Sequence, residues 1–182
     1  PHILMIIDER TSRSETVAAI ARSIMTAGRT APKSKGVDLI EIVTITGETV
    51  ARLAEATRRA GEENGMQFFL RDADNILQAQ AVILVGSRSS SMALDCGYCG
   101  FMSCAAKNGH PAVPCALNSV DLGIAIGSMT ARAADLRVDC RVMYSVGAAA
   151  RRIGLLEECR AVFAIPLSIS SKNPFFDRQT HR

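Results

Sequence analysis

Aromatic residues are scarce in this sequence of 182 residues, which has no Trp, two Tyr and six Phe. The core must therefore be aliphatic, and the scarcity argues against a nucleic-acid module that stacks bases on aromatic rings. Long charged runs are also missing, because basic and acidic residues are interspersed and the net charge is only +3. No electrostatic footprint of nucleic-acid binding is visible, and we expect no such partner.

Long apolar runs are equally absent. The longest, residues 3–7 and 81–85, have only the length of a strand, whereas a membrane-spanning helix needs about 20 apolar residues. The first run is followed at once by Asp8 and Glu9 and lacks the basic start and the small-residue cleavage site of a secretory signal. We therefore expect no membrane span and a cytoplasmic location.

The remaining composition, 48% hydrophobic and 21% charged, is typical of a globular domain. Apolar residues at helical spacing predict longer helices over residues 11–28, 47–64 and 120–136, and shorter ones over 72–78 and 148–156. Apolar or β-branched runs predict strands over residues 37–46, 67–70, 81–85, 141–146 and 161–169. Ser12 and Glu15 fit a capping box for the first helix. We expect one α+β domain over residues 1–182, in which helices cover a modest sheet.

Cysteine is the residue type that stands out. Four of the six cysteines lie within twenty residues and form the pattern C-x2-C-x4-C-x10-C: Cys96, Cys99, Cys104 and Cys115. Without an export signal, clustered thiols indicate a metal site rather than disulfides. Four thiolates can hold a [4Fe–4S] cluster, and Gly97 and Gly100 would let the backbone wrap closely around it. We predict a cluster-binding segment over residues 94–118, with these four cysteines as ligands.

Other interpretations of the cysteines remain open. A structural zinc site also uses C-x2-C, although zinc ribbons usually repeat that pair. Free thiols, buried or redox-active, are a third possibility. Cys140 and Cys159 lie at the edges of predicted strands, and we expect both to be small core residues. His110 lies between the third and fourth cysteines, where a solvated loop histidine is a simpler interpretation than a ligand.

A second candidate site lies at the start of the first predicted helix. Arg10, Thr11 and Arg13 combine two guanidinium groups with a hydroxyl and free helix N–H groups, which together can bind an anion. The simpler alternative is a capped helix start whose charges are solvated. Basic residues elsewhere, such as Lys33 and Lys172, are by themselves ordinary surface charges.

The order Arg-Thr-Ser-Arg, helix, Ala-Gly-Arg-Thr-Ala-Pro-Lys-Ser, strand and helix resembles the opening of the FMN-dependent nitroreductase family. This resemblance implies a nitroreductase-like sheet, FMN as cofactor, and a homodimer with sites at the subunit interface. It further implies phosphate contacts from Arg10, Thr11, Arg13, Lys172 and Arg178, and contacts beside the flavin ring from Lys33 and Ser34. The sequence departs from the family at Glu9, where an Arg is expected, and after Ser34, where Asn-Gln-Pro-Trp is missing.

A closer resemblance covers nearly the whole chain. Its motifs are residues 29–33, the cysteine segment, and residues 121–125, 141–144, 165–168 and 172–178. Together they are similar to an uncharacterised prokaryotic family described as containing a ferredoxin domain, which implies an iron–sulfur cluster. The C-x2-C-x4-C core also resembles the small cluster domain of corrinoid-linked and electron-bifurcating anaerobic enzymes, where the fourth cysteine lies further on. Cys140 is therefore the alternative to Cys115 as fourth ligand.

These observations favour an iron–sulfur redox protein that moves electrons between a [4Fe–4S] cluster and FMN, because a flavin converts two-electron into one-electron chemistry. Two alternatives remain, a flavin-free electron carrier or sensor and a zinc-stapled interaction domain. The sequence contains no P-loop and no Ser–His–Asp pattern. An enzymatic role would be that of a flavin-dependent oxidoreductase, with catalytic residues, substrate and redox partner unknown.

Overall fold

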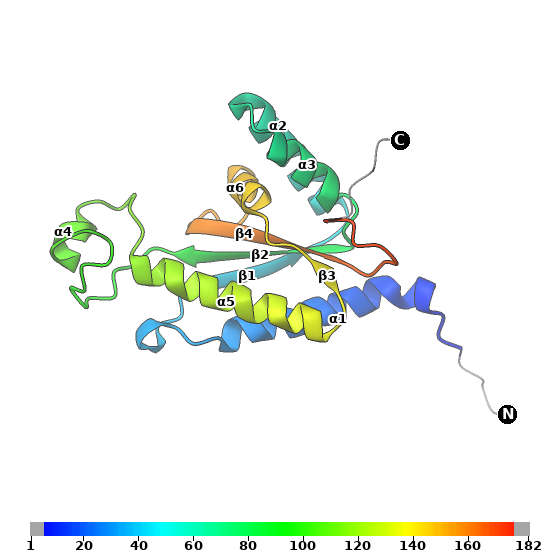
Figure 1. Cartoon of the computed structure of the whole chain (residues 1–182), viewed down its shortest axis with the longest axis horizontal. Coiled ribbons are helices and arrows are strands. Elements are labelled where there is room, and N and C mark those ends of the chain that lie inside the picture. Colours follow the sequence, from blue (N-terminus) through cyan, green and yellow to red (C-terminus); the bar gives the residue numbers. More distant parts are fainter. Residues whose placement is uncertain (1–5, 177–182) are drawn as a thin grey trace.

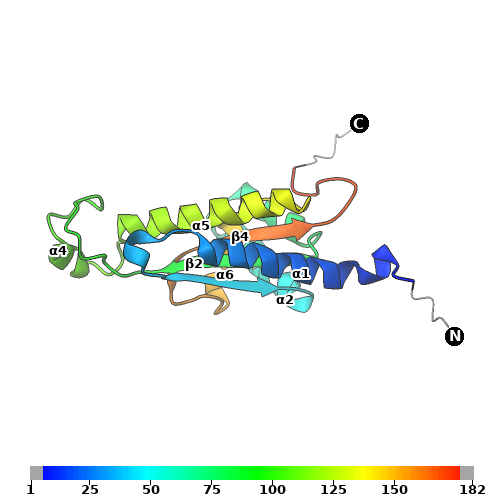
Figure 2. The same ribbon diagram turned by 90° about the horizontal axis from the view of Figure 1, so that it is seen from below.

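A four-stranded antiparallel sheet lies between two layers of helices in the computed structural model, which describes residues 6–176 (Figure 1). The strand order is β1 (Ile40–Ile45), β2 (Ala81–Arg88), β4 (Cys159–Ser168) and β3 (Asp139–Cys140). One face is covered by α1 (Glu9–Thr30) and α5 (Ala116–Asp135), which lie side by side (Figure 2). The other face carries α2 (Glu48–Asn64), α3 (Gln67–Ile76) and α6 (Tyr144–Arg152). The predicted α+β class, a sheet covered by helices, is confirmed.

The central strand β2 divides the core into two halves. Its first seven residues are all buried, since both faces of the sheet are covered. Side chains alternate between the two faces of a strand. Val82 and Leu84 therefore join the core under α2 and α6, whereas Ile83 and Val85 join the core under α1 and α5. The aliphatic core expected from the scarcity of aromatics is thus built around one apolar strand.

Helix α1 begins and ends at other residues than predicted. Asp8 is its N-cap and accepts the Thr11 N–H at 3.0 Å, so the predicted capping box at Ser12 is wrong. Ser12 lies inside the helix and donates its hydroxyl to the Asp8 carbonyl at 2.8 Å. Gly28 does not end the helix. It packs closely on α5, where a Cβ at this position would lie 2.6 Å from the Met129 sulfur. The helix stops at Thr30, ahead of Pro32.

Two predicted strands are helical in the structure. Residues 67–70 form the first turn of α3, and residues 144–146 begin α6. Local β propensity favoured strands at both places, but burial at helical spacing decides the outcome in α6, where Val146, Ala149 and Ala150 all enter the core. Of the predicted strand over residues 141–146, only a single bridge between Met143 and Ala164 remains.

The strand predicted over residues 81–85 extends three residues further than expected. β2 continues to Arg88. Gly86 has no side chain and so leaves room for Cys159 on the neighbouring strand β4, because a Cβ at position 86 would lie 2.8 Å from the Cβ of Cys159. Beyond Arg88 the chain leaves the sheet and returns at α5, and the short helix α4 (Cys104–Asn108) lies in this excursion. A short 3-10 turn, Ser34–Gly36, links α1 to β1. Within residues 6–176, no helix is long and apolar enough to cross a membrane.

Candidate functional site: a cysteine pocket and a basic hollow

The segment between β2 and α5 projects beyond the end of the sheet and carries the cysteine cluster (Figure 1). Two cysteines come from the loop, the third is the first residue of α4, and the fourth is the N-cap residue of α5. All four predicted ligands line a single pocket: Cys96, Cys99, Cys104 and Cys115. The pocket holds about 330 Å³ of space free of atoms, its open mouth included. The fold thus brings together thiols that are up to nineteen positions apart.

Backbone turns shape this loop. Gly97 and Gly100 have φ values of 72° and 84°, in the left-handed region that glycine adopts without strain. The Gly100 N–H donates to the Gly97 carbonyl at 2.9 Å and closes a tight turn next to Cys99. Asp95, itself at a φ of 44°, accepts the Cys104 N–H with its carboxylate at 2.6 Å. These contacts fix the backbone around Cys99 and Cys104.

The four pocket cysteines differ in their exposure to solvent. Cys96 is exposed, Cys99 and Cys104 are half-buried, and Cys115 is buried. Cys115 lies at the N-terminus of α5, a helix of 20 residues whose dipole favours negative charge at that end. Phe101 lines the pocket and stacks on His110, with ring centroids 5.1 Å apart. His110 itself does not line the pocket, which agrees with its interpretation as a loop residue.

The donor set and its spacing fit an iron–sulfur cluster. In the part of the chain that the structure describes, no three His, Cys, Asp or Glu side chains converge as ligands of a single metal ion. A [4Fe–4S] cluster takes four thiolate ligands, and the four cysteines that line this pocket provide that number.

The other two cysteines lie outside this pocket. Cys140 belongs to β3, at the opposite end of the sheet from α4, so the structure does not support it as the alternative fourth ligand (Figure 1). It is half-buried against the core under α1 and α5, and burial and the neighbouring Asp139 raise the pKa of its thiol. Cys159 lies in the opposite core, where burial, with a smaller contribution from Glu158, raises its pKa to about 11. Both thiols stay protonated and behave as apolar groups.

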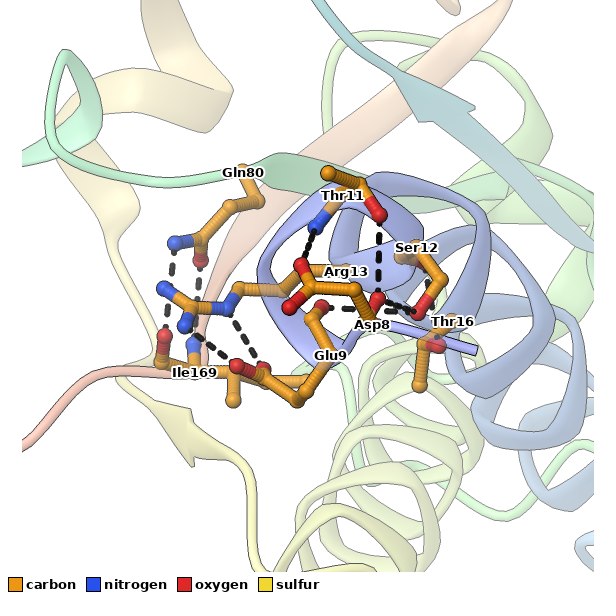
Figure 3. A network of polar contacts seen from close by, with 8 residues as sticks. All are labelled: Asp8, Glu9, Thr11, Ser12, Arg13, Thr16, Gln80 and Ile169. Carbon is orange, nitrogen blue, oxygen red and sulfur yellow. Dashed lines mark hydrogen bonds and ion pairs between the residues drawn. The ribbon is translucent and has the colours of Figure 1, made fainter. Parts of the chain in front are cut away.

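Arg10 and Arg13 meet the segment that follows β4. Together with Ile169, Ser170 and Ser171 they line an open hollow of about 840 Å³, solvent space included. Figure 3 shows the Arg13 side chain beside Gln80 and Ile169. Lys172, another predicted phosphate contact, directly follows the lining residue Ser171 in the sequence. Arg178, the last predicted phosphate contact, lies outside the described residues.

One of the two guanidinium groups of this hollow already has a partner. Arg13 donates from Nε and Nη2 to the two carboxylate oxygens of Glu9 at 2.7 and 2.6 Å (Figure 3). These hydrogen bonds lower the pKa of Glu9, which therefore remains a charged competitor for any anion. The Thr11 hydroxyl donates to the Asp8 carbonyl at 3.1 Å and serves the helix start. In this hollow, Glu9 therefore holds one of the two guanidinium groups.

The two residues predicted to lie beside a flavin ring perform structural roles in this chain. Lys33 donates from its ammonium to the carbonyls of Gly28 and Arg29 at the end of α1. Ser34 donates its N–H and its hydroxyl to one carboxylate oxygen of Asp121, at 3.0 and 2.8 Å. Asp121 itself is buried in α5, so this contact joins the turn after α1 to the helix layer.

The phosphate and ring-side candidates are far apart within one chain. Helix α1 separates them, and its 22 residues span about 33 Å at the rise of an α-helix. Arg10 and Arg13 lie at its start, whereas Lys33 and Ser34 follow its end. One chain therefore does not bring the two predicted halves of a flavin site together.

Sequence reasoning missed Lys107, which lines the same pocket as the four cysteines. Its side chain is only 4% exposed. The one local signal is its position in α4, three residues after Cys104. Lysine is almost never fully buried without a partner, so burial of this residue could only be recognised in the folded chain.

Comparison with known proteins places these features in a wider group. A family model described as "Uncharacterized protein containing a ferredoxin domain" matches residues 111–178. This span contains Cys115 but not the three earlier pocket cysteines. A curated relative from Archaeoglobus fulgidus, described as an uncharacterized protein, is 38% identical over 182 residues and is matched across 96% of this chain and 98% of its own length.

Several solved structures similar to this one are flavoproteins. A nitroreductase with bound FMN from Desulfitobacterium hafniense matches with a TM-score of 0.57 and 13% identity, over 94% of this chain and 82% of its own. A BluB-like flavoprotein from Clostridium difficile matches with a TM-score of 0.56 and 14% identity, over 100% and 88%. An FMN-dependent nitroreductase from Mycobacterium smegmatis, in complex with NADPH, matches with a TM-score of 0.57 and 12% identity, over 87% and 81%. At these identities the likeness shows a shared fold.

Proposed function

Because the chain belongs to the family of uncharacterised proteins containing a ferredoxin domain, we propose that it is an iron–sulfur redox protein with a [4Fe–4S] cluster. The observation that carries the proposal is that Cys96, Cys99, Cys104 and Cys115 line one pocket. A cluster bound there would accept and release single electrons. The N-terminus of α5 would favour the negative charge of the thiolates, and Met92, Leu94 and Phe101 would limit access of water.

The proposed partner of the cluster is FMN, held on the nitroreductase-like scaffold. Arg10 and Arg13 offer guanidinium groups for its phosphate in the hollow beside Ser170. The ring-side candidates lie at the other end of α1, so a complete flavin site requires a second copy of the chain. The outer face of α5 suits such a contact, because Val120, Gly123, Ile124 and Gly127 leave it exposed and uncharged. A homodimer is therefore part of this proposal.

A flavin-free electron carrier is the second candidate, and one contact favours it. Glu9 occupies Arg13 with two charge-assisted hydrogen bonds, which a phosphate group would have to displace. In this version the cluster exchanges electrons directly with a partner protein that approaches the exposed side of the pocket, where Cys96 and Tyr98 lie.

The cluster is tested by anaerobic reconstitution of the full chain with iron and sulfide. Iron, zinc, sulfide and flavin are quantified on one sample, together with its visible absorption spectrum. Cys115→Ser should lose the cluster, whereas the matched control Cys140→Ser should keep it. Equal cluster content in the two variants would contradict the assignment of Cys115, and one zinc per chain without sulfide would replace the redox function by a structural one.

Flavin binding is tested by titrating FMN into the reconstituted protein. Glu9→Gln should tighten binding, because it removes a negative charge and leaves Arg13 free, and Arg13→Gln should weaken it. Sedimentation of the same samples, with Ile124→Glu as a variant of the α5 face, measures the contribution of the dimer. If neither the wild type nor Glu9→Gln binds FMN, the flavin-free carrier is the better description.

A further inference from the structure

Asn118, in the first turn of α5, has a buried amide of which only one atom is hydrogen-bonded. The side chain is 3% exposed, and its Oδ1 accepts the Ser90 N–H at 3.0 Å. Its Nδ2 is buried and has no hydrogen-bond partner within residues 6–176. Buried polar groups are almost always hydrogen-bonded, because leaving one unpaired is unfavourable. The Asn118 amide therefore indicates an acceptor that the described part of the chain does not supply.

Asn118 lines a hollow where the end of β2, the start of β4 and the start of α5 meet. This hollow, called the Asn118 hollow below, holds about 200 Å³ of space free of atoms, its open mouth included. The amide end of Asn118 is fixed at its wall, because the Ser90 that it contacts directly follows the lining residue Ser89. The hollow shares no lining residue with the cysteine pocket. Its other lining residues are Ser87, Arg88, Pro114, Ser119, Leu122, Arg160 and Ala161.

The Asn118 hollow offers hydrogen-bond donors and positive charge but no acid. None of its nine lining residues is Asp or Glu, whereas two are arginines. Arg88 forms an ion pair with Glu41 at 3.0 Å. Arg160 donates from Nε to the Ala112 carbonyl at 2.8 Å and takes part in none of the ion pairs between described residues. The hollow thus combines an unpartnered amide donor with a guanidinium whose charge is not balanced by an acid.

We propose that the Asn118 hollow binds a small oxyanion, the phosphate or carboxylate group of a small ligand. One oxygen of the anion accepts a hydrogen bond from Asn118 Nδ2 and so supplies the missing partner. The Arg160 guanidinium balances the charge, and hydrogen bonds between guanidinium groups and oxyanions are about twice as strong as neutral ones. This binding site goes beyond the proposed function, because it contains no cysteine and does not require a cluster.

A buried water is the alternative occupant of the hollow. Such a water forms about three hydrogen bonds with polar groups, and the Asn118 amide and the neighbouring serine hydroxyls could provide them. A water carries no charge, however, and leaves the positive charge of Arg160 unbalanced. The two occupants differ in their dependence on charge, since removal of a guanidinium weakens the binding of an anion and leaves a water in place.

The experiment titrates the full chain, labelled with the NMR-active isotope of nitrogen, with inorganic phosphate and separately with acetate at constant ionic strength. The side-chain NH2 signals of Asn118 are identified as the pair that is missing from Asn118→Asp. We expect this pair to shift in a saturable way with at least one of the two anions, and the anion that binds more tightly distinguishes a phosphate from a carboxylate ligand. No saturable shift with either anion would overturn the inference in favour of a water.

Two arginine variants test whether the binding depends on charge at this place. Arg160→Gln removes the guanidinium from the hollow and should raise the dissociation constant of the anion by about tenfold or more, the effect of losing one charge-assisted hydrogen bond. Arg59→Gln is the matched control, because Arg59 lies on α2 with its side chain 68% exposed, and it should leave the constant unchanged. An unchanged constant in Arg160→Gln, or equal losses in both variants, would refute the inference.

A third variant tests the amide itself. Asn118→Asp keeps an oxygen that accepts the Ser90 N–H, but it replaces the Nδ2 donor by a second carboxylate oxygen, which repels an anion. Binding, followed by the backbone amide signal of Ser90, should be lost. An anion that binds this variant as tightly as the wild type would contradict the proposed contact with Asn118. Arg160 is exposed, so Arg160→Gln still decides the question if Asn118→Asp does not fold.

Discussion

A methyl group added at Gly147 tests how closely α6 packs on the sheet. A Cβ at this position would lie 2.1 Å from the Val162 carbonyl oxygen and 2.6 Å from the Phe163 Cα. Both are backbone atoms of β4, which cannot swing aside as the end of a side chain can. To bring the first contact to 3.0 Å, the helix must move away from the strand by about 0.9 Å.

This movement has a cost that can be bounded. A gap of about 0.5–1 Å forfeits a quarter to a half of the dispersion energy of a contact, and α6 contributes Val146, Ala149 and Ala150 to the core. Overpacking costs about 1–3 kcal/mol, and a backbone obstacle places Gly147→Ala at the upper end. Alanine returns about 1 kcal/mol through its higher helix propensity. We therefore expect a net loss of about 2 kcal/mol.

Urea unfolding followed by circular dichroism measures this loss, which corresponds to a fall of about 4–8 °C in melting temperature for a chain of this size. Gly127→Ala is the matched control, because a Cβ there meets nothing within 4 Å and should raise stability by about 0.5–1 kcal/mol. If Gly147→Ala is as stable as the wild type, α6 does not pack as closely as described. Equal losses in both variants would show that the effect does not come from the contact with Val162.

Two further predictions concern buried polar groups. Ser145→Ala removes the hydroxyl that donates to the Asp72 carboxylate at 2.5 Å. Because both residues are buried, the free energy of unfolding should fall by about 1–3 kcal/mol. A change below about 0.5 kcal/mol in urea unfolding would contradict this prediction. The Cys159 thiol has its pKa raised from 9.0 to about 11 by burial, so the unfolded chain ionises first and stability should fall as the pH rises from about 9 to 11. Cys159→Ala should flatten this part of the stability profile by up to about 3 kcal/mol, and parallel profiles for the two proteins would refute the assignment.

Sequence patterns predicted the elements whose burial follows their own periodicity. Helix α2 was placed within a residue of its observed bounds, and β2 and β4 were both recognised as strands. The failures lie where local propensity and packing disagree. Residues 67–70 and 144–146 have strand-forming side chains, yet each starts a helix whose buried residues recur at helical spacing. Packing outweighs a propensity difference of at most about 1 kcal/mol.

Sequence-based prediction likewise succeeded for one candidate site and less well for the other. Spacing alone grouped four cysteines, and the structure places all four in one pocket. The assignments taken from a family resemblance fared differently: Arg10 and Arg13 share a hollow, but Lys33 and Ser34 are used to join the end of α1 to its surroundings. A family resemblance identifies matching residue types in this sequence. It does not show which other groups in the folded chain, such as the Gly28 carbonyl or the Asp121 carboxylate, already form hydrogen bonds with those residues.

The sequence by itself determined the aliphatic core, the order of most helices and strands, and the thiol-rich segment, because each depends on neighbours within a few residues. The tertiary structure alone decided that Cys115 joins the pocket while Cys140 lies at the other end of the sheet. It also decided that Lys107 is buried beside four thiols. These outcomes depend on contacts between segments far apart in the chain, and such contacts exist only once the sheet has assembled and α5 has packed against it.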